Sequence, residues 1–286
     1  IMMPTCANVS FKLNSIQIDW QIIFMAFSLV GIYFSFFVKE KLLIPKKFLL
    51  RLIIAGILIS SHWVAFFYAI KTSGVSLTLS IMASGAFVTS LIEPLFFKRK
   101  FSFKELTFGS IALIGLIIIF RAEFDQYFGM SIAFLATILS VFFTLINSNL
   151  VKEKQSPIKI TFYELFIGWL AITIFMFFDM DQIKSLFKFD YKDLILLIVL
   201  GSICTAYAHV ISVKVMRNLS PFSFMVIINL EPVYAILLSL IFFGKDELMS
   251  FDSYIGFVLI LIAIFLDTLD KRKNRVKKLS KKNIHL

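Results

Sequence analysis

Residues 220–243 read SPFSFMVIINLEPVYAILLSLIFF, and this stretch decides what kind of fold the chain can adopt. It is apolar over more than the roughly 20 residues that a helix needs to cross the hydrocarbon core of a bilayer. Its one charged side chain, Glu231, stands at the middle, where a charge costs about 2.5–3.5 kcal/mol on insertion scales. Pro232 lacks an N–H and leaves the carbonyl of Ile228 without its helical partner. We expect a kinked membrane helix that turns Glu231 and Asn229 toward an internal, wet site.

Two readings of this stretch stay open. Glu231 and Asn229 are candidates for binding substrate or a proton, because ionisable groups inside membranes are usually functional. The alternative is a structural kink at Pro232 whose acid is hydrogen-bonded to a neighbouring helix. The dipeptide recurs at Glu93 and Pro94, near the charged end of another apolar segment. We interpret that second pair as a gate, a kink or a helix cap.

The composition extends the membrane interpretation to the whole chain. Of its 286 residues, 59% are hydrophobic and 16% are charged, and the mean hydropathy is +0.90. Soluble domains lie nearer to half apolar and a quarter charged. The sequence therefore predicts an all-α, multi-spanning membrane protein. Ten spans are expected, at residues 1–13, 20–38, 48–70, 73–97, 104–121, 127–151, 158–179, 191–216, 220–243 and 252–269.

The chain also repeats itself. FYAIKTSGVS at 67–76 aligns with VKVMRNLSPF at 213–222, which lays Lys71 over Arg217. We expect two five-helix repeats, and because five is odd, the second repeat enters the membrane from the opposite side, as in inverted-repeat transporters. The comparison also indicates that the first span lacks its leading residues. The predicted divisions are residues 1–122 and 123–269, followed by a basic tail at 270–286.

Charge sets the expected orientation. Most of the 29 Lys and Arg residues lie in alternate linkers and in the tail at 271–283. The opposite side collects acids such as Asp179 and Asp181. By the positive-inside rule, both ends of the intact chain are cytoplasmic. The net charge is +11, and we expect the basic tail to contact anionic lipids of the membrane surface. We do not expect the chain to bind nucleic acid.

Metal, cofactor and catalytic chemistry find no support in the sequence. Cys6 and Cys204 both lie in apolar segments and indicate neither a disulfide framework nor a zinc site. His62 and His209 lack the spacing of metal ligands. No convergent set of nucleophile, acid and base appears. We therefore expect no metal, no cofactor and no catalytic residue.

The two expected repeats close on a shared pattern. It reads SLIEPLFFKRKFSFKELTFGSIALIGLIIIF at 90–120 and LEPVYAILLSLIFFGKDELMSFDSYIGFVLILIAIF at 230–265. This pattern resembles the EamA-type transporters of the bacterial drug/metabolite transporter superfamily. The resemblance implies a ten-helix exporter of small metabolites in a bacterial inner membrane, with alternating access to a central cavity shared by the two repeats.

The resemblance also extends to single residues. Lys12 and Lys152 match the lysine that the family often has at the end of the first helix of each repeat. The family's common arginine early in the second helix is missing. Phe24 and Met25 stand near its place in the first repeat, and Glu164 stands near its place in the second.

Several further side chains are candidates for the cavity. His62 and His209 fall on equivalent expected helices and approach the shared axis from opposite leaflets. Either could titrate near neutral pH or hydrogen-bond a substrate, and a histidine satisfied by a neighbouring helix is the equally weighted alternative. Trp63 and Tyr234 could stack on an organic substrate, although ordinary packing is the simpler interpretation of any one aromatic.

These observations lead to one functional expectation and two alternatives. We expect a secondary transporter, an exporter of amino acids or similar small metabolites that works by alternating access, with Glu231 as the candidate for proton coupling. The first alternative is an intramembrane transferase. The second is a passive channel or lipid scramblase with the same fold.

Overall fold

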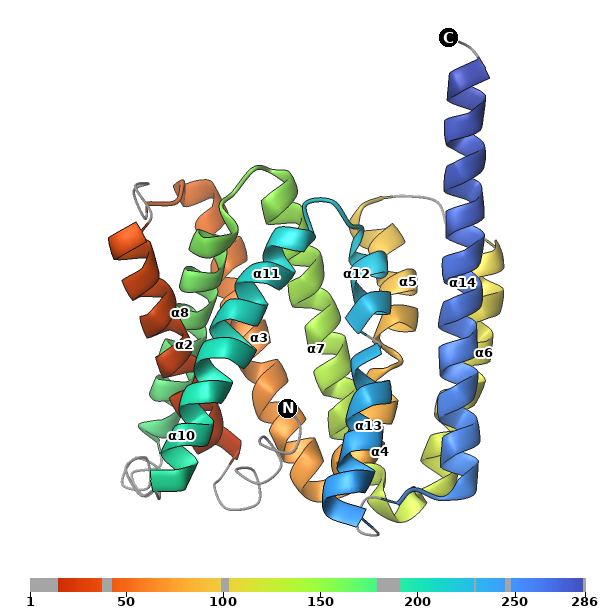
Figure 1. Ribbon diagram of the computed structural model, residues 1–286, viewed down its shortest axis with the longest axis horizontal. Coiled ribbons are helices and arrows are strands. Elements are labelled where there is room, and N and C mark those ends of the chain that lie inside the picture. Colours follow the sequence, from red (N-terminus) through yellow and green to blue (C-terminus); the bar gives the residue numbers. More distant parts are fainter. Residues whose placement is uncertain are drawn as a thin grey trace.

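The computed structural model describes residues 15–37, 43–98, 103–178, 191–228, 230–244 and 248–284. Within these ranges every regular element is helical, and the long helices stand side by side and run alternately up and down (Figure 1). The expected first span, at 1–13, lies outside the described residues. The helices are α2 (Ser15–Phe37), α3 (Lys46–Ser73), α4 (Val75–Met82), α5 (Gly85–Phe96), α6 (Phe103–Ala122), η1 (Phe124–Gln126), α7 (Tyr127–Lys152), α8 (Pro157–Met176), α10 (Tyr191–Val199), η2 (Leu200–Tyr207), α11 (Ala208–Val215), α12 (Pro221–Ile228), α13 (Leu230–Phe243) and α14 (Phe251–Ile284).

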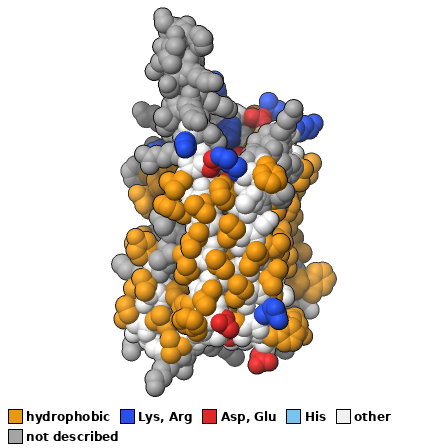
Figure 2. Space-filling view, turned by 90° about the vertical axis from the view of Figure 1, so that its right-hand side faces the viewer, with side chains coloured by type: hydrophobic (Ala, Val, Ile, Leu, Met, Phe, Trp, Pro, Cys, Tyr) orange, Lys and Arg blue, Asp and Glu red, His pale blue; other side chains and the backbone are white. Residues whose placement is uncertain are grey.

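The described helices have the length and surface of membrane spans. Seven segments in this part of the chain are long and apolar enough to cross a bilayer, and α6 contributes a shorter apolar stretch, Thr107–Ala122. Figure 2 shows hydrophobic side chains over the middle of one face and charged side chains toward its ends. Such a belt suits contact with lipid tails. The prediction of an all-α, multi-spanning membrane protein is confirmed.

Close glycine contacts hold the pair formed by α6 and α14. A Cβ placed on Gly115 would lie 2.5 Å from the carbonyl oxygen of Gly256, and the reverse distance is also 2.5 Å. Only glycine lets two helix backbones approach so closely, which is the usual way that membrane helices gain packing contacts. At one end of the pair, Lys104 forms an ion pair with Asp270. At the other end, the Glu123 carboxylate accepts hydrogen bonds from the Ser250 backbone and the Ser253 hydroxyl.

The helix α14 continues past the bundle. It has 34 residues, so it is about 51 Å long, whereas its candidate membrane span ends at Asp270. Figure 1 shows its end standing clear of the other helices. The sequence predicts a separate basic tail at residues 270–286. Up to Ile284, this segment continues the helix of the last span.

The helix α3 packs against both α7 and α8. A Cβ on Gly56 of α3 would lie 2.9 Å from the Glu164 carbonyl oxygen of α8, so these two helices also cross closely. Where α3 and α7 approach the polar surface, Arg51 donates a 2.5 Å hydrogen bond to Glu153. That hydrogen bond lowers the pKa of Glu153 below its ordinary value.

Candidate functional site

Two spans are broken, and the breaks lie against each other. Between α4 and α5 the helix is interrupted at Ala83 and Ser84, and α12 and α13 are separate helices on either side of Asn229, which lies outside the described residues. The helix α4 contacts α13, and α5 contacts α12, so the four short helices form one layer (Figure 1). A broken helix at membrane depth is stable only where protein or water surrounds its freed backbone groups. Ala83 and Ser84 at the first break are fully buried, whereas Ile227 and Glu231 on either side of Asn229 are exposed.

The first of these breaks differs from the expectation of one continuous span over residues 73–97. Pro94 lies inside α5 without dividing it, and the interruption comes earlier, directly before Gly85. A Cβ on Gly85 would lie 2.8 Å from Cε of Met225 in α12. Close packing between the two broken spans, and not proline, therefore accompanies the break in the first one.

Two adjoining cavities border the second break. Their volumes are about 300 and 170 Å³, and we treat them together as the central cavity. Both are lined from α3, α4, α11, α12 and α13. The residues that line both are His62, Leu79, Met82, His209, Ser212, Ile228 and Glu231.

Glu231 supplies the carboxylate of the central cavity. It lies in the first turn of α13, and its side chain is exposed while lining both parts of the cavity. Within the described chain it forms neither a hydrogen bond nor an ion pair. Pro232 follows in the same first turn, just after the interruption of the span, and Asn229 lies outside the described residues. The Glu231 side chain is thus accessible from the cavity.

His62 offers a hydrogen-bond acceptor to the same space. Its Nδ1 lies 2.8 Å from the Ala136 carbonyl oxygen of α7, and its side chain is buried. A carbonyl only accepts hydrogen bonds, so Nδ1 carries the hydrogen and the neutral ring keeps Nε2 as an acceptor. Phe66 and Phe143 contact the ring at centroid distances of 6.2 and 5.6 Å. The ring orientation of His62 is therefore fixed by packing and by one hydrogen bond.

His209 connects the cavity to a buried acid. Its Nε2 lies 3.0 Å from Oε2 of Glu164 in α8, and Asn147 of α7 donates to the same oxygen at 3.1 Å. The side chain of Glu164 has no solvent exposure. The sequence singles out His209, whereas Glu164 stands out only by its place near the missing family arginine. The hydrogen bonds of Glu164 could not be predicted from the sequence, because they form only when α7, α8 and α11 pack together.

Other candidates lie elsewhere. Trp63 lines the larger part of the central cavity. Tyr234 is 66% exposed and lines neither part, so the structure does not bring it to the other candidates. The Lys152 ammonium lies 4.8 Å from the centre of the Phe97 ring, away from the cavity, and Lys12 is outside the described residues.

Glu93 joins the two broken spans at a different depth. It is 9% exposed, and its Oε2 accepts a 3.1 Å hydrogen bond from the Phe222 backbone in the first turn of α12. A carboxylate in this position has the geometry of a helix cap and complements the helix dipole. Glu93 and Pro94 do not line the central cavity.

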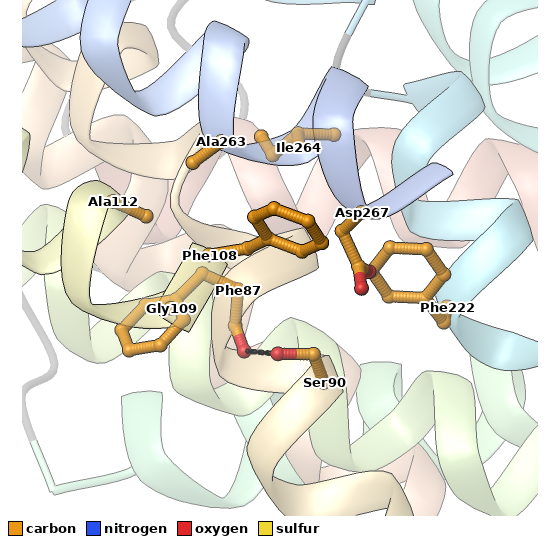
Figure 3. A pocket seen from close by; sticks show the side chains of 9 residues that line it. All are labelled: Phe87, Ser90, Phe108, Gly109, Ala112, Phe222, Ala263, Ile264 and Asp267. Atoms are coloured by element: carbon orange, nitrogen blue, oxygen red, sulfur yellow. Dashed lines mark hydrogen bonds between the residues drawn. The ribbon is translucent and has the colours of Figure 1, made fainter. Parts of the chain in front are cut away.

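A further hollow is too small for an organic ligand. It lies among α5, α6, α12 and α14 and has room for about one water, at about 10 Å³. Figure 3 shows the Ser90 hydroxyl bonded to the Phe87 carbonyl and the Asp267 carboxylate beside the Phe222 ring. No group of three or more potential metal ligands occurs among the described residues. The lining residues of this hollow are Phe87, Ser90, Phe108, Gly109, Ala112, Phe222, Ala263, Ile264 and Asp267.

Comparison with known proteins agrees with this architecture. The model of the EamA-like transporter family matches residues 12–121 and 127–268, which is most of the chain. Among solved structures, 28 chains match. One of them, a crystal structure described only as that of a protein, has a TM-score of 0.66 and 12% sequence identity over 95% of this chain and 93% of its own. That likeness shows a shared fold. No curated protein sequence matches the chain.

Proposed function

Because the chain belongs to the EamA-like transporter family, we propose that it carries a small organic metabolite across a membrane through the central cavity. The family consists of transporters and not of enzymes. The observation that carries the proposal is the cavity itself, which is lined by two histidines and by the Glu231 carboxylate, for which the described residues supply no partner. Spans from both family-matched segments line it, His62 from the first and Glu231 from the second.

The substrate class follows from the lining. A cavity of about 300 Å³, joined to one of about 170 Å³, suits a ligand at the small end of the range for organic molecules. Glu231 would pair with an ammonium group, while Trp63, Phe66 and Phe67 provide apolar and aromatic wall. An amino acid or a comparable small amine fits this combination. Glu231 is also our candidate for proton coupling, since it could take up a proton when the amine leaves.

Alternating access is the mechanism we propose. Inverted repeats would let the cavity open first to one side and then to the other by rocking of two similar bundles. Two features support this: the family model matches two consecutive segments, and the broken span of one segment packs on the broken span of the other. We also propose that transport is outward and that the membrane is a bacterial inner membrane, and both points rest on the family resemblance. The charge pattern supports a cytoplasmic position for the basic tail.

The proposal is tested by counterflow in proteoliposomes. Amino acids and small amines are first screened for a rise in the melting temperature of the purified protein, and the best ligand is then used in radiolabelled form. Preloaded unlabelled ligand should accelerate labelled uptake, which a channel or scramblase would not show. Failure of every amine to stabilise the protein, or absence of counterflow, would count against an amine carrier.

The variant that addresses the mechanism is Glu231→Gln. Loss of a charge-assisted hydrogen bond worth about 1.5–3 kcal/mol predicts that transport falls by about tenfold or more, with folded yield unchanged. Glu153→Gln, at an exposed acid outside the cavity, is the matched control and should transport normally. If Glu231→Gln transports like the wild type at every pH, neither substrate binding nor proton coupling depends on this acid.

A further inference from the structure

A large hollow lies on the flank of the bundle, separate from the central cavity. Its volume is about 660 Å³, and it is formed by α2, the start of α8, and the continuous segment from η2 through α11. It shares no lining residue with the central cavity. We call it the lateral groove. Its size falls in the range that accommodates a ligand of some hundreds of daltons.

The walls of the lateral groove are apolar along most of its length. Val30 and Ala206 are buried at its floor, and Leu29 and Ile211 are exposed along its sides. Exposed apolar side chains on a membrane span face lipid tails and not water. The hollow is therefore open to the hydrocarbon region of the bilayer, where acyl chains are the molecules at hand.

One end of the groove is basic. Lys214 stands in the last turn of α11, and Arg217 follows in the turn beyond it; both side chains are exposed. Arg217 donates one hydrogen bond, at 3.2 Å, to the Gln155 carbonyl oxygen, which fixes it at this end. Across the ranges that the structure describes, neither cation has a carboxylate partner. Two cations without a counter-charge thus lie where an apolar groove meets the polar surface.

The distance along the groove from its floor to its basic end matches the hydrocarbon thickness of one leaflet of the bilayer. From Ala206 to Lys214 the helix rises about 12 Å, and the hydrocarbon part of one leaflet is about 15 Å thick. A phosphate held by Lys214 and Arg217 would therefore sit at headgroup level while its acyl chain lies along the groove. A soluble anion would leave the apolar walls empty, and a neutral lipid would leave the two cations unpaired.

We propose that the lateral groove binds one anionic phospholipid, with the phosphate at Lys214 and Arg217 and an acyl chain along α2 and α11. Each basic side chain near a membrane surface contributes about a fivefold preference for anionic over neutral lipid, so the pair predicts a preference of about 25-fold. The lateral groove and the central cavity share no lining residue, although the segment from η2 through α11 borders both.

Native mass spectrometry tests the proposal directly. The full chain is purified into nanodiscs of mixed phosphatidylglycerol and phosphatidylcholine, transferred to detergent, and the lipids retained per protein are counted. We expect one retained phosphatidylglycerol per protein in the wild type. In the double variant Lys214→Ala, Arg217→Ala, the preference should fall to near parity. A melting temperature that rises with added phosphatidylglycerol only in the wild type would give the same answer.

The matched control for the single variant Lys214→Ala removes one exposed lysine from the far side of the bundle, Lys98→Ala, next to α5 (Figure 1). It loses the same charge and should retain the lipid. A groove-filling variant, Val210→Trp, keeps both cations and should also lose it. The proposal fails if phosphatidylcholine is retained equally well by the wild type, if the far-side variant loses as much lipid as Lys214→Ala, or if the double variant and Val210→Trp both retain phosphatidylglycerol.

Discussion

The two broken spans share a backbone feature and differ in what they present at the break. Between α4 and α5 the chain has Ala83 and Ser84, both fully buried, followed by Gly85. Between α12 and α13 it has a break followed by Glu231 and Pro232, and the acid lines the central cavity. One break is closed by small side chains that let the neighbouring span approach. At the other, Asn229 lies outside the described residues, and the neighbouring acid lines the central cavity.

This difference separates the contributions of the two family-matched segments. The first provides close packing and the fixed imidazole of His62, while the second provides Glu231 and the buried cluster of Glu164 with His209. The two segments therefore do not supply the same chemistry. If transport depends on the segment around Glu231, changes there should be far more damaging than matched changes at the closed break between α4 and α5.

The largest expected contrast comes from Pro232→Ala and Ser84→Ala. Alanine at 232 restores an N–H, which lets α12 and α13 join into one helix and displaces Glu231. Misplacement of a binding group by about 1 Å can cost about a hundredfold, so we expect counterflow to fall at least tenfold. The Ser84 hydroxyl is buried with no hydrogen-bond partner in the described chain, so its loss should change transport less than twofold. Similar losses in both variants would remove the distinction between the breaks.

A smaller effect is expected from the buried acid of the second segment. Glu164→Ala leaves the Asn147 amide and the His209 imidazole without their acceptor, at a cost of about 1–3 kcal/mol for each buried group. The melting temperature should therefore fall by several degrees. Thr161→Val is the control on the same helix, because the Thr161 hydroxyl is buried and unpartnered within the described chain. Equal melting temperatures for wild type and Glu164→Ala would contradict the role assigned to this cluster.

The smallest expected effect is at the closed break itself. The Cβ of Gly85→Ala would meet Cε of Met225, the mobile end of a flexible side chain, so the stability should fall by less than about 1 kcal/mol. Gly115→Ala would instead meet the Gly256 backbone at 2.5 Å and should cost about 1–3 kcal/mol. Thermal unfolding in one detergent compares the two. A larger loss of stability in Gly85→Ala than in Gly115→Ala would show that the side chains around the closed break cannot adjust.

The sequence was sufficient for the fold class and the family, because both depend on local properties. Apolar runs longer than a bilayer is thick identify spans without any tertiary information. The division of the span at 73–97 could not be predicted, since Ala83 and Ser84 carry neither a proline nor a charge. That break depends on α4 and α5 each meeting a separate helix of the other broken span.

Part of the candidate site could likewise be predicted from the sequence, and part could not. Glu231, His62, His209 and Trp63 stand out in an apolar sequence, and the structure brings them to one cavity. Their function stays a prediction. Glu164 could not be weighed from the sequence, because its partners come from α7 and α11. Tyr234 illustrates the converse: an aromatic close to Glu231 along the chain faces elsewhere once the helix forms, since neighbouring helix positions point in different directions.

The last helix has a mechanical consequence. The part of α14 beyond Asp270 adds about 20 Å of straight rod to a span whose crossing with α6 is fixed at Gly115 and Gly256. The rod therefore acts as a pointer for the α6–α14 pair: a tilt of that pair by about 10° displaces the tip by several ångströms. Any rocking of the bundle is therefore largest, and most easily recorded by a probe, at the end of the chain farthest from the central cavity.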